Sequence, residues 1–439
     1  MKSQEEKMQT LKITKFAQFE NLTLPIKDYL VLIGPQASGK SNISKLIYFF
    51  KSLRDDFKTY IHAHFGLTQI NAPLASYIKH IRNKFREFWG ENFDISELDI
   101  CYFYDENKSI WINIIPDASN KYIDIKFSDN FIQLFEQIIN NNKEYALLLK
   151  PQQTVINPLL EYQMKKSDLL KRLTEQINNM FAEDEELIFI PAGRAIAALF
   201  YNTTDRSKLD PIITNFFDRI LFTKSIFNHS LEQIIENREK LTDKIINYPL
   251  VNLAKTLINN ILKGVYICEN DGTQKIYFDL ENKRYTEINY SSSGQQESLW
   301  ILLFIFLLIL EETKVFIVIE EPEAHLYPEA QKQIIDLISL LSNSNNNQII
   351  ITTHSPYILS AISNLIYAQK VGAKHPQEVG KKIHQSLWLD INKIGSYCLD
   401  KNVFRDILDQ EIHSIELEAI DSASRLINND YEHLFNLDE

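Results

Sequence analysis

Cysteine is scarce in this chain, which has only three in 439 residues: Cys101, Cys268 and Cys398. They are odd in number and far apart, and no Cys-x-x-Cys or Cys/His spacing occurs. This pattern indicates neither a disulfide framework nor a structural zinc site, and it is typical of a reducing compartment. We therefore expect a cytoplasmic protein.

A hydrophobic run long enough to cross a membrane is also missing. The longest apolar run extends from Leu299 to Leu310 and is shorter than the ~20 residues that a bilayer-spanning helix needs. The opening residues, MKSQEEKMQT, are charged and lack the apolar centre of a signal peptide. These features predict a soluble protein without a membrane partner, with a core helix at 299–310.

Positive charge is in deficit, because 46 Lys and Arg stand against 58 Asp and Glu and the formal net charge is −12. This balance argues against a surface that binds nucleic acid in general, but it leaves room for a local basic patch. One candidate patch lies in the predicted helical region 51–96, with basic positions at Lys79, His80, Arg82, Lys84 and Arg86. A charged face of this kind is usually solvated, so DNA binding here is the less favoured interpretation.

Hydrophobic residues form 45 % of the chain, which is ample for substantial cores, and the length suggests two or three domains. Three strand-like runs at 98–104, 110–115 and 122–127 predict an antiparallel meander. Helical periodicity is predicted after this meander, at 129–181 and 205–262.

A phosphate-loop motif follows the apolar strand predicted at 29–33. Residues 34–41, GPQASGKS, match G-x-x-x-x-G-K-[ST] at every fixed position and precede a predicted helix. Glycines let backbone N–H groups turn toward phosphate oxygens, and the helix N-terminus adds a favourable dipole. We expect Lys40 to reach the β- and γ-phosphates of ATP and Ser41 to ligate Mg²⁺. The predicted nucleotide-binding residues are Gly34, Pro35, Gln36, Ala37, Ser38, Gly39, Lys40, Ser41 and Asn42.

A second informative segment is the apolar run 315–319, which leads directly into Glu320, Glu321 and Pro322. A continuous apolar run predicts a strand buried on both faces of a parallel sheet. The two acids then lie at its carboxyl end, where open α/β sheets bind their ligands. Adjacent buried carboxylates are costly unless a cation or phosphate chemistry uses them. Taken alone, the pair fits ordinary surface acids equally well.

Two further segments carry polar residues beside predicted strands or helices. Residues 291–297, SSSGQQE, open the apolar helix and resemble an anion-binding helix start, although helix capping alone explains them. The strand predicted at 348–352 ends in Thr353 and His354, so this histidine also lies at a strand's carboxyl end.

A further loop follows the strand predicted at 187–190. Its residues 191–194, PAGR, place Arg194 at a helix start after a glycine turn. This arrangement favours a second phosphate-facing loop, with an ordinary strand-to-helix turn as the alternative.

Four motifs occur in a fixed order: the phosphate loop, the helix start SSSGQQE, the strand with two acids and the strand that ends in His354. This order resembles that of ABC-type ATPases of the SMC/RecF/OLD group. SSSGQQE resembles the family signature, although it lacks the usual leucine and second glycine. Glu320 resembles the Walker B acid, where aspartate is commoner, and Glu321 resembles the hydrolytic glutamate that follows it. AHLYP at 324–328 resembles the D-loop, and His354 resembles the switch histidine. The strings EPEAHLYP and PAGR are similar to those of OLD-like bacterial ATPases.

The resemblance implies an α/β fold: a P-loop ABC-type ATPase core, with a mixed sheet and an antiparallel meander, and a largely helical insertion. The expected segments are 1–56 and 264–400 for the core, 57–263 for the insertion and 401–439 for a helical tail. Within the insertion, the meander at about 98–127 and strand 187–190 are expected to pack on the core. A long coiled coil is not expected, because the middle segment lacks long heptads.

The resemblance also implies a site shared between two copies of the chain. Glu321, His354 and Lys40 are the expected catalytic residues, and Ser41 and Glu320 the expected Mg²⁺ ligands. The second copy is expected to contribute Ser292, Ser293, Gly294 and Gln295, and Arg194 is a further candidate for nucleotide binding. No clear Q-loop glutamine is found, since Gln152 and Gln153 are poor candidates.

Three functions fit this ATPase. The first, which we favour, is a subunit that controls a separate effector, such as a nuclease, in bacterial anti-phage systems similar to PARIS and Septu. The short tail shows no Asp-x-Asp pair after a strand, so a fused TOPRIM nuclease is not expected. The second is a RecF-like DNA-repair ATPase. The third is a PrrC-like RNase, for which Arg425 and His433 are spaced too far apart; an ABC importer ATPase fits less well.

Overall fold

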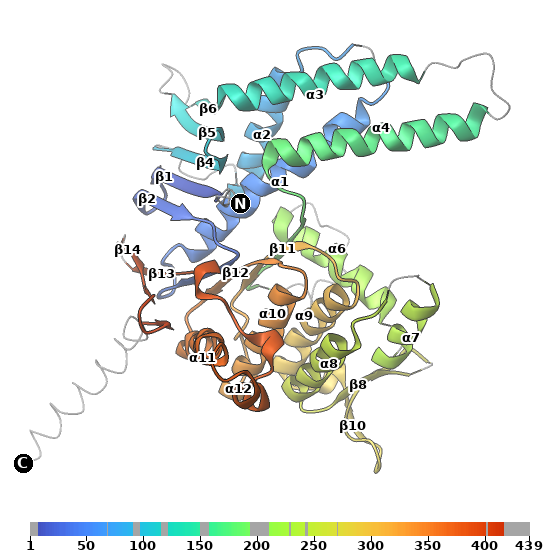
Figure 1. Ribbon diagram of the computed structural model, residues 1–439, viewed down its shortest axis with the longest axis vertical. Coiled ribbons are helices and arrows are strands. Elements are labelled where there is room, and N and C mark those ends of the chain that lie inside the picture. Colours follow the sequence, from blue (N-terminus) through green and yellow to red (C-terminus); the bar gives the residue numbers. More distant parts are fainter. Residues whose placement is uncertain are drawn as a thin grey trace, which may run out of the picture. The chain divides into compact units, whose positions relative to one another are not determined.

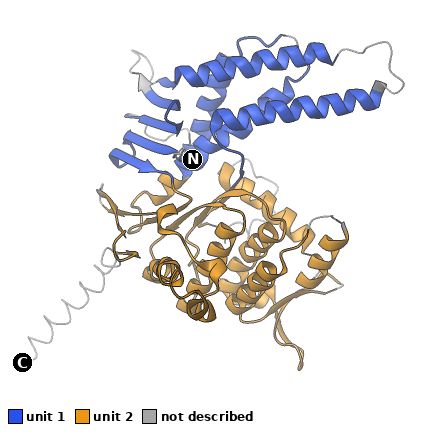
Figure 2. Cartoon of the chain, viewed as in Figure 1, with its two compact units in different colours: residues 1–26, 45–187 blue, residues 27–44, 188–439 orange. Residues whose placement is uncertain are grey.

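The computed structural model describes residues 8–67, 69–90, 97–115, 122–149, 158–193, 210–227, 230–241, 245–269, 271–400 and 403–416. The chain forms two compact units (Figure 2). Unit 1 contains residues 1–26 and 45–187, and unit 2 contains residues 27–44 and 188–439. The phosphate loop and the three later motifs therefore all belong to unit 2. Arg194, Gln152, Gln153, Arg425 and His433 lie outside the described residues.

Unit 1 is built on an antiparallel sheet with the strand order β2-β1-β4-β5-β6. Its strands are β1 (Thr10–Phe16), β2 (Phe19–Pro25), β4 (Asp99–Asp105), β5 (Lys108–Ile115) and β6 (Tyr122–Phe127). The predicted meander is therefore present, and β1 extends it by pairing with β4. The expectation that residues 1–56 form one part of the ATPase core is wrong for β1 and β2. These two strands pair with β4 and each other, and not with the strand that precedes the phosphate loop.

The helices of unit 1 are α2 (Pro73–Trp89), α3 (Asp129–Leu148), α4 (Pro158–Phe181) and most of α1 (Lys40–Ala63). α3 and α4 pack along each other as a long pair (Figure 1), and Asn141 donates to Gln176 across them. The core of the unit is rich in aromatic side chains. Phe57 stacks on Phe135 with ring centroids 4.8 Å apart.

Unit 2 contains a mixed sheet with the strand order β14-β13-β3-β12-β11-β7. Its strands are β3 (Tyr29–Ile33), β7 (Glu186–Ile190), β11 (Val315–Glu320), β12 (Gln348–Thr353), β13 (Ile394–Asp400) and β14 (Val403–Asp406). β3 pairs in parallel with β12 and β13, and β12 pairs in parallel with β11. Every residue of β3 and β11 is buried, as expected for strands covered on both faces. This confirms the predicted α/β fold.

The helices of unit 2 surround an apolar core centred on α9. They are α6 (Pro211–Ile226), α7 (Leu231–Leu241), α8 (Tyr248–Leu262), α9 (Ser293–Leu310), α10 (Pro328–Ser344), α11 (Pro356–Gly372) and α12 (Pro376–Lys382). α9 packs against α8 and α10 (Figure 1). It has the length and composition of a membrane span, but every residue from 298 to 310 is buried inside the unit. The apolar residues of α6, α7 and α8 belong to the same core, although the sequence placed 205–262 in the insertion.

Shorter elements complete unit 2. They are the sheet β10-β9-β8, with β8 (Val265–Cys268), β9 (Gln274–Asp279) and β10 (Arg284–Glu287), the pair β15 (Leu408–Asp409) and β16 (Ser414–Ile415), and 3-10 helices η2 (Ile288–Tyr290), η3 (Gln385–Leu387) and η4 (Ile391–Lys393). The helical tail expected at 401–439 is wrong for residues 403–416, which form β14, β15 and β16. β14 pairs with β13, and Phe404 stacks on Tyr397 at 4.7 Å, so this segment completes the sheet.

Candidate functional site

The predicted motifs follow three neighbouring parallel strands of the mixed sheet. The phosphate loop follows β3, His354 follows β12, and Glu320 and Glu321 stand at the end of β11. The register aligns Ile33 with Thr353 and Glu320 with Thr352. Because parallel strands end at the same edge, the three motifs lie at one edge of one sheet.

The phosphate loop encloses the ammonium group of Lys40. Lys40 Nζ donates to the carbonyl oxygens of Gly34 and Pro35, each at 2.8 Å, and to Ser38 Oγ at 3.3 Å. The side chain is buried, and burial lowers the pKa of Lys40, while the carboxylates of Glu321 and Glu323 act in the opposite direction. The loop's own carbonyl groups therefore hold the cation.

Two glycines of the loop are required by its backbone. A Cβ atom at Gly34 would lie 2.0 Å from the carbonyl oxygen of Leu399 at the end of β13, so no side chain fits there. Gly39 has φ 89°, in the left-handed region that favours glycine. The spacing in the motif therefore has a visible steric cause.

Glu320 is a buried carboxylate that several donors contact. Ser44 Oγ donates to Oε1 at 3.4 Å, the backbone N–H of Ala192 donates to Oε2 at 3.1 Å, and the side chain of Ser41 also bonds it. Burial raises the pKa of Glu320 despite these bonds. A serine hydroxyl next to a carboxylate is an oxygen donor set of the kind that Mg²⁺ accepts together with phosphate oxygens, so the residues fit the predicted metal.

Glu321 and His354 form a second pair. Glu321 Oε1 lies 3.2 Å from His354 Nε2, and both side chains are partly exposed. The backbone of Glu321 has φ 46°, which is left-handed and strained for a non-glycine residue. Its N–H donates to the carbonyl oxygen of Thr352 at 2.8 Å. The strained residue turns the chain out of β11 directly at the site.

Glu323 belongs to the site but was given no role from the sequence. Its Oε1 accepts from Thr353 Oγ1 at 2.7 Å and from the backbone N–H of His354 at 3.0 Å. The only sequence signal is its place in the string EEPE. A sequence does not reveal that this side chain meets residues 353 and 354, which lie about thirty positions away. The sequence likewise does not reveal that Ala192 and Ser44 contact Glu320, from which they are even farther away along the chain.

The segment SSSGQQE caps α9 in this structure. Ser292 and Gln295 form a reciprocal capping box, and Gln295 Nε2 also donates to the carbonyl oxygen of Leu262 at 2.7 Å. A Cβ atom at Gly294 would lie 2.4 Å from the carbonyl oxygen of His325, so the helix start packs closely on the AHLYP segment. Ser292 and Ser293 are exposed. Within the described residues, the hydrogen bonds of Ser292 and Gln295 do not reach the phosphate loop.

The PAGR loop begins beside Glu320, because the N–H group of Ala192 donates to that carboxylate. Arg194 itself lies outside the described residues. Its proposed contact with nucleotide stays a prediction.

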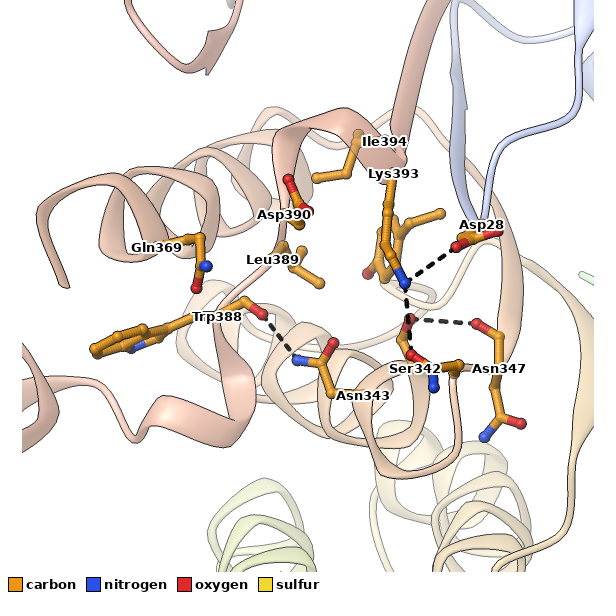
Figure 3. A pocket seen from close by; sticks show the side chains of 12 residues that line it. Asp28, Ser342, Asn343, Asn347, Gln369, Trp388, Leu389, Asp390, Lys393 and Ile394 are labelled. Atoms are coloured by element: carbon orange, nitrogen blue, oxygen red, sulfur yellow. Dashed lines mark hydrogen bonds and ion pairs between the residues drawn. The ribbon is translucent and has the colours of Figure 1, made fainter. Parts of the chain in front are cut away.

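A separate pocket of about 220 Å³ lies at the opposite, amino-terminal edge of the same sheet (Figure 3). Lys393 Nζ lies 3.5 Å from Asp28 Oδ2 and 3.5 Å from Asn346 Oδ1, and Asn343 donates to the carbonyl oxygen of Trp388 at 2.8 Å. These polar groups pair with one another, and none of the predicted site residues lines the pocket.

The α/β sheet and the loop after β3 define a P-loop nucleotide-binding protein. A family model described as "AAA ATPase domain" matches residues 7–359. The chain belongs to this family. None of the curated proteins compared with it matches.

Solved structures similar to this chain include an SMC head domain from Thermotoga maritima, with 11 % identity, coverage of 91 % of this chain and 98 % of that one, and a TM-score of 0.38. An SMC head bound to the C-terminal winged-helix domain of ScpA has 13 % identity, 92 % and 98 % coverage, and a TM-score of 0.39. The recombination mediator RecF has 11 % identity, 91 % and 98 % coverage, and a TM-score of 0.27.

Proposed function

We propose that the protein binds ATP with Mg²⁺ and hydrolyses it to ADP and phosphate. The observation that supports this most is that the phosphate loop with Lys40, the acid Glu320 and the Glu321–His354 pair all follow or end three neighbouring parallel strands. Membership of the AAA ATPase domain family agrees with it.

Binding would use the phosphate loop. Lys40 would exchange the carbonyl groups of Gly34 and Pro35 for β- and γ-phosphate oxygens, and the helix N-terminus would add backbone N–H donors. Ser41 and Glu320 would hold Mg²⁺, which supplies positive charge beside the phosphates when it is bound. That positive charge would also stabilise the ionised form of the buried Glu320.

Hydrolysis would use Glu321 and His354. Glu321 would orient a water molecule and accept its proton as the water oxygen bonds to the γ-phosphorus and the bond to the ADP oxygen breaks. His354 would stabilise the charge on the transferring phosphoryl group, and its contact with Glu321 at 3.2 Å would orient both side chains.

We propose that a second copy of the chain completes each site. Ser292 and Ser293 are exposed at the N-terminus of α9. There they would donate hydrogen bonds to a phosphate of the ATP that the neighbouring copy binds. The resemblance of SSSGQQE to the ABC-type signature supports the same arrangement.

The biological role we propose is control of a separate effector, a nuclease, in anti-phage defence. The similarity of EPEAHLYP and PAGR to OLD-like bacterial ATPases supports it. We expect an adjacent gene that encodes a TOPRIM or HNH nuclease, and we expect that nuclease to copurify with the protein. Adjacent replication genes would favour the DNA-repair alternative.

Direct DNA binding has little support from the basic residues of α2. Arg82 lies over the Tyr122 ring and donates to the carbonyl oxygen of Ile123, and Lys84 pairs with Asp56. These side chains are therefore engaged inside unit 1. Salt-dependent DNA binding by the purified chain would revive this alternative.

Phosphate release by the full chain tests the proposed ATPase. We expect hydrolysis that requires Mg²⁺ and that falls about 100-fold in K40A, because the loop then lacks its cation. K393A is the matched control, since Lys393 pairs with a carboxylate at the opposite edge of the sheet and should leave the rate within about twofold of wild type. Hydrolysis at an unchanged rate in K40A would contradict the proposal.

A further inference from the structure

We propose that Glu323 is a positioning residue for ATP hydrolysis, acting through Thr353 and His354. This role rests on the proposed function, because it presupposes that His354 and Glu321 take part in hydrolysis.

The contacts of Glu323 join the ends of two strands. Its Oε1 accepts one hydrogen bond from the side chain of Thr353, the last residue of β12, and one from the backbone N–H of His354. The hydroxyl of Thr353 in turn accepts from the backbone N–H of Ser355 at 3.0 Å. Hydrogen bonds to an ionised carboxylate are about twice as strong as neutral ones, so Glu323 fixes the backbone on either side of the histidine.

His354 depends on such contacts because packing does not hold it. Its side chain is 41 % exposed, and that of Glu321 is 32 % exposed. The imidazole of His354 contacts the carboxylate of Glu321, and the backbone N–H of His354 donates to Glu323. Two carboxylates from one loop therefore set the position of His354, one at the ring and one at the main chain.

The burial of Glu323 points to a role beyond stability. The residue is 7 % exposed, and its second oxygen, Oε2, is buried without a hydrogen-bond partner among the described residues. An unpaired buried oxygen of a charged group lowers the stability of the fold. The carboxylate of Glu323 also opposes the lowering of the Lys40 pKa that burial causes, so it lies within the electrostatic reach of the phosphate loop.

A double-mutant cycle distinguishes positioning from a purely structural effect. We expect E323A to lower kcat about 10- to 100-fold, because a small displacement of His354 costs rate, while the Kd for ATP stays within about threefold. In the H354A background, E323A should lower kcat by less than about twofold, since the group it positions is absent.

D336N is the matched control. Asp336 is also a buried carboxylate of unit 2, bonded to Lys332 and with a buried oxygen that lacks a partner among the described residues. It should lower Tm without changing kcat. Equal losses of kcat from E323A in both backgrounds, or a loss in D336N as large as that in E323A, would overturn the positioning role.

Conservative variants decide the matter if H354A is too slow to measure. E323Q keeps a carbonyl acceptor and should retain at least about a third of the wild-type kcat, whereas E323L has a similar size, no acceptor and should lose about tenfold. Wild-type turnover by E323L would overturn the proposal.

A readout without hydrolysis separates this proposal from the proposed function. Exchange of the His354 amide hydrogen should be faster in E323L than in wild type and unchanged in E323Q. If the wild-type chain does not hydrolyse ATP, the proposed function fails. Unchanged exchange in E323L would show, independently of hydrolysis, that Glu323 does not position His354.

Discussion

Lys40 and Glu320 are buried charged groups whose ordinary partners in catalysis would be a ligand and a metal. Burial lowers the pKa of Lys40 and raises that of Glu320, so both shifts favour the neutral forms. Phosphate oxygens near Lys40 and Mg²⁺ near Glu320 would favour the charged forms again. These opposite shifts therefore favour joint binding of an anion and a divalent cation.

A different buried carboxylate gives a pH test at the level of single residues. Glu183 pairs with Lys51 inside unit 1, and burial raises its pKa from 4.5 to about 8, while Lys51 acts in the opposite direction. Because the folded pKa is the higher one, its contribution to stability is present below about pH 4.5 and is lost as the pH rises through about 8.

We predict that E183Q removes this part of the pH dependence. Urea unfolding at pH 5 and pH 8 should show a smaller fall in the free energy of unfolding for E183Q than for wild type. E20Q, which changes an exposed partner of Lys15, is the control and should behave like wild type. An identical pH dependence in E183Q and wild type would contradict the assignment.

Strands and helix starts made most of the site predictable. β3, β11 and β12 are short apolar runs with polar residues directly after them, and their parallel pairing brings Lys40 and Glu320 to one edge. The start of α9 was predicted equally well, because serine and glutamine three positions apart form a capping box.

Other elements could not be read from the sequence. β14 has only four residues and forms because β13 offers it an edge, which is a long-range effect without a local signal. The helices α6 to α8 have helical periodicity, but the sequence does not indicate that their apolar faces share a core with α9. The contacts of Glu323 with β12 likewise depend on the fold as a whole.

S292D tests whether the start of α9 acts on a nucleotide as well as capping a helix. Aspartate is as good an N-cap as serine, so the free energy of unfolding should stay within about 0.5 kcal/mol of wild type. Its negative charge would repel a phosphate, and hydrolysis should fall about tenfold or more. S292A is the control for capping and should cost about 1 kcal/mol of stability. Full hydrolysis by S292D would leave α9 with a capping role only.

At the scale of the molecule, the nucleotide site and the large α3–α4 pair belong to different units. α1 begins directly after the phosphate loop in unit 2 and continues in unit 1. Unit 2 carries all of the described residues assigned to ATP, including the exposed Ser292 and Ser293 that we assign to the site of a second copy. A working enzyme is therefore expected to be at least a dimer when ATP is bound.

The variant E321Q tests this account most directly. Glutamine keeps the size of Glu321 but cannot accept the proton of the attacking water, so bound ATP should persist. Incubated with ATP and Mg²⁺, E321Q should sediment as a dimer that contains ATP, with turnover reduced about 100-fold or more. An E321Q chain that hydrolyses ATP at the wild-type rate would contradict the central claim.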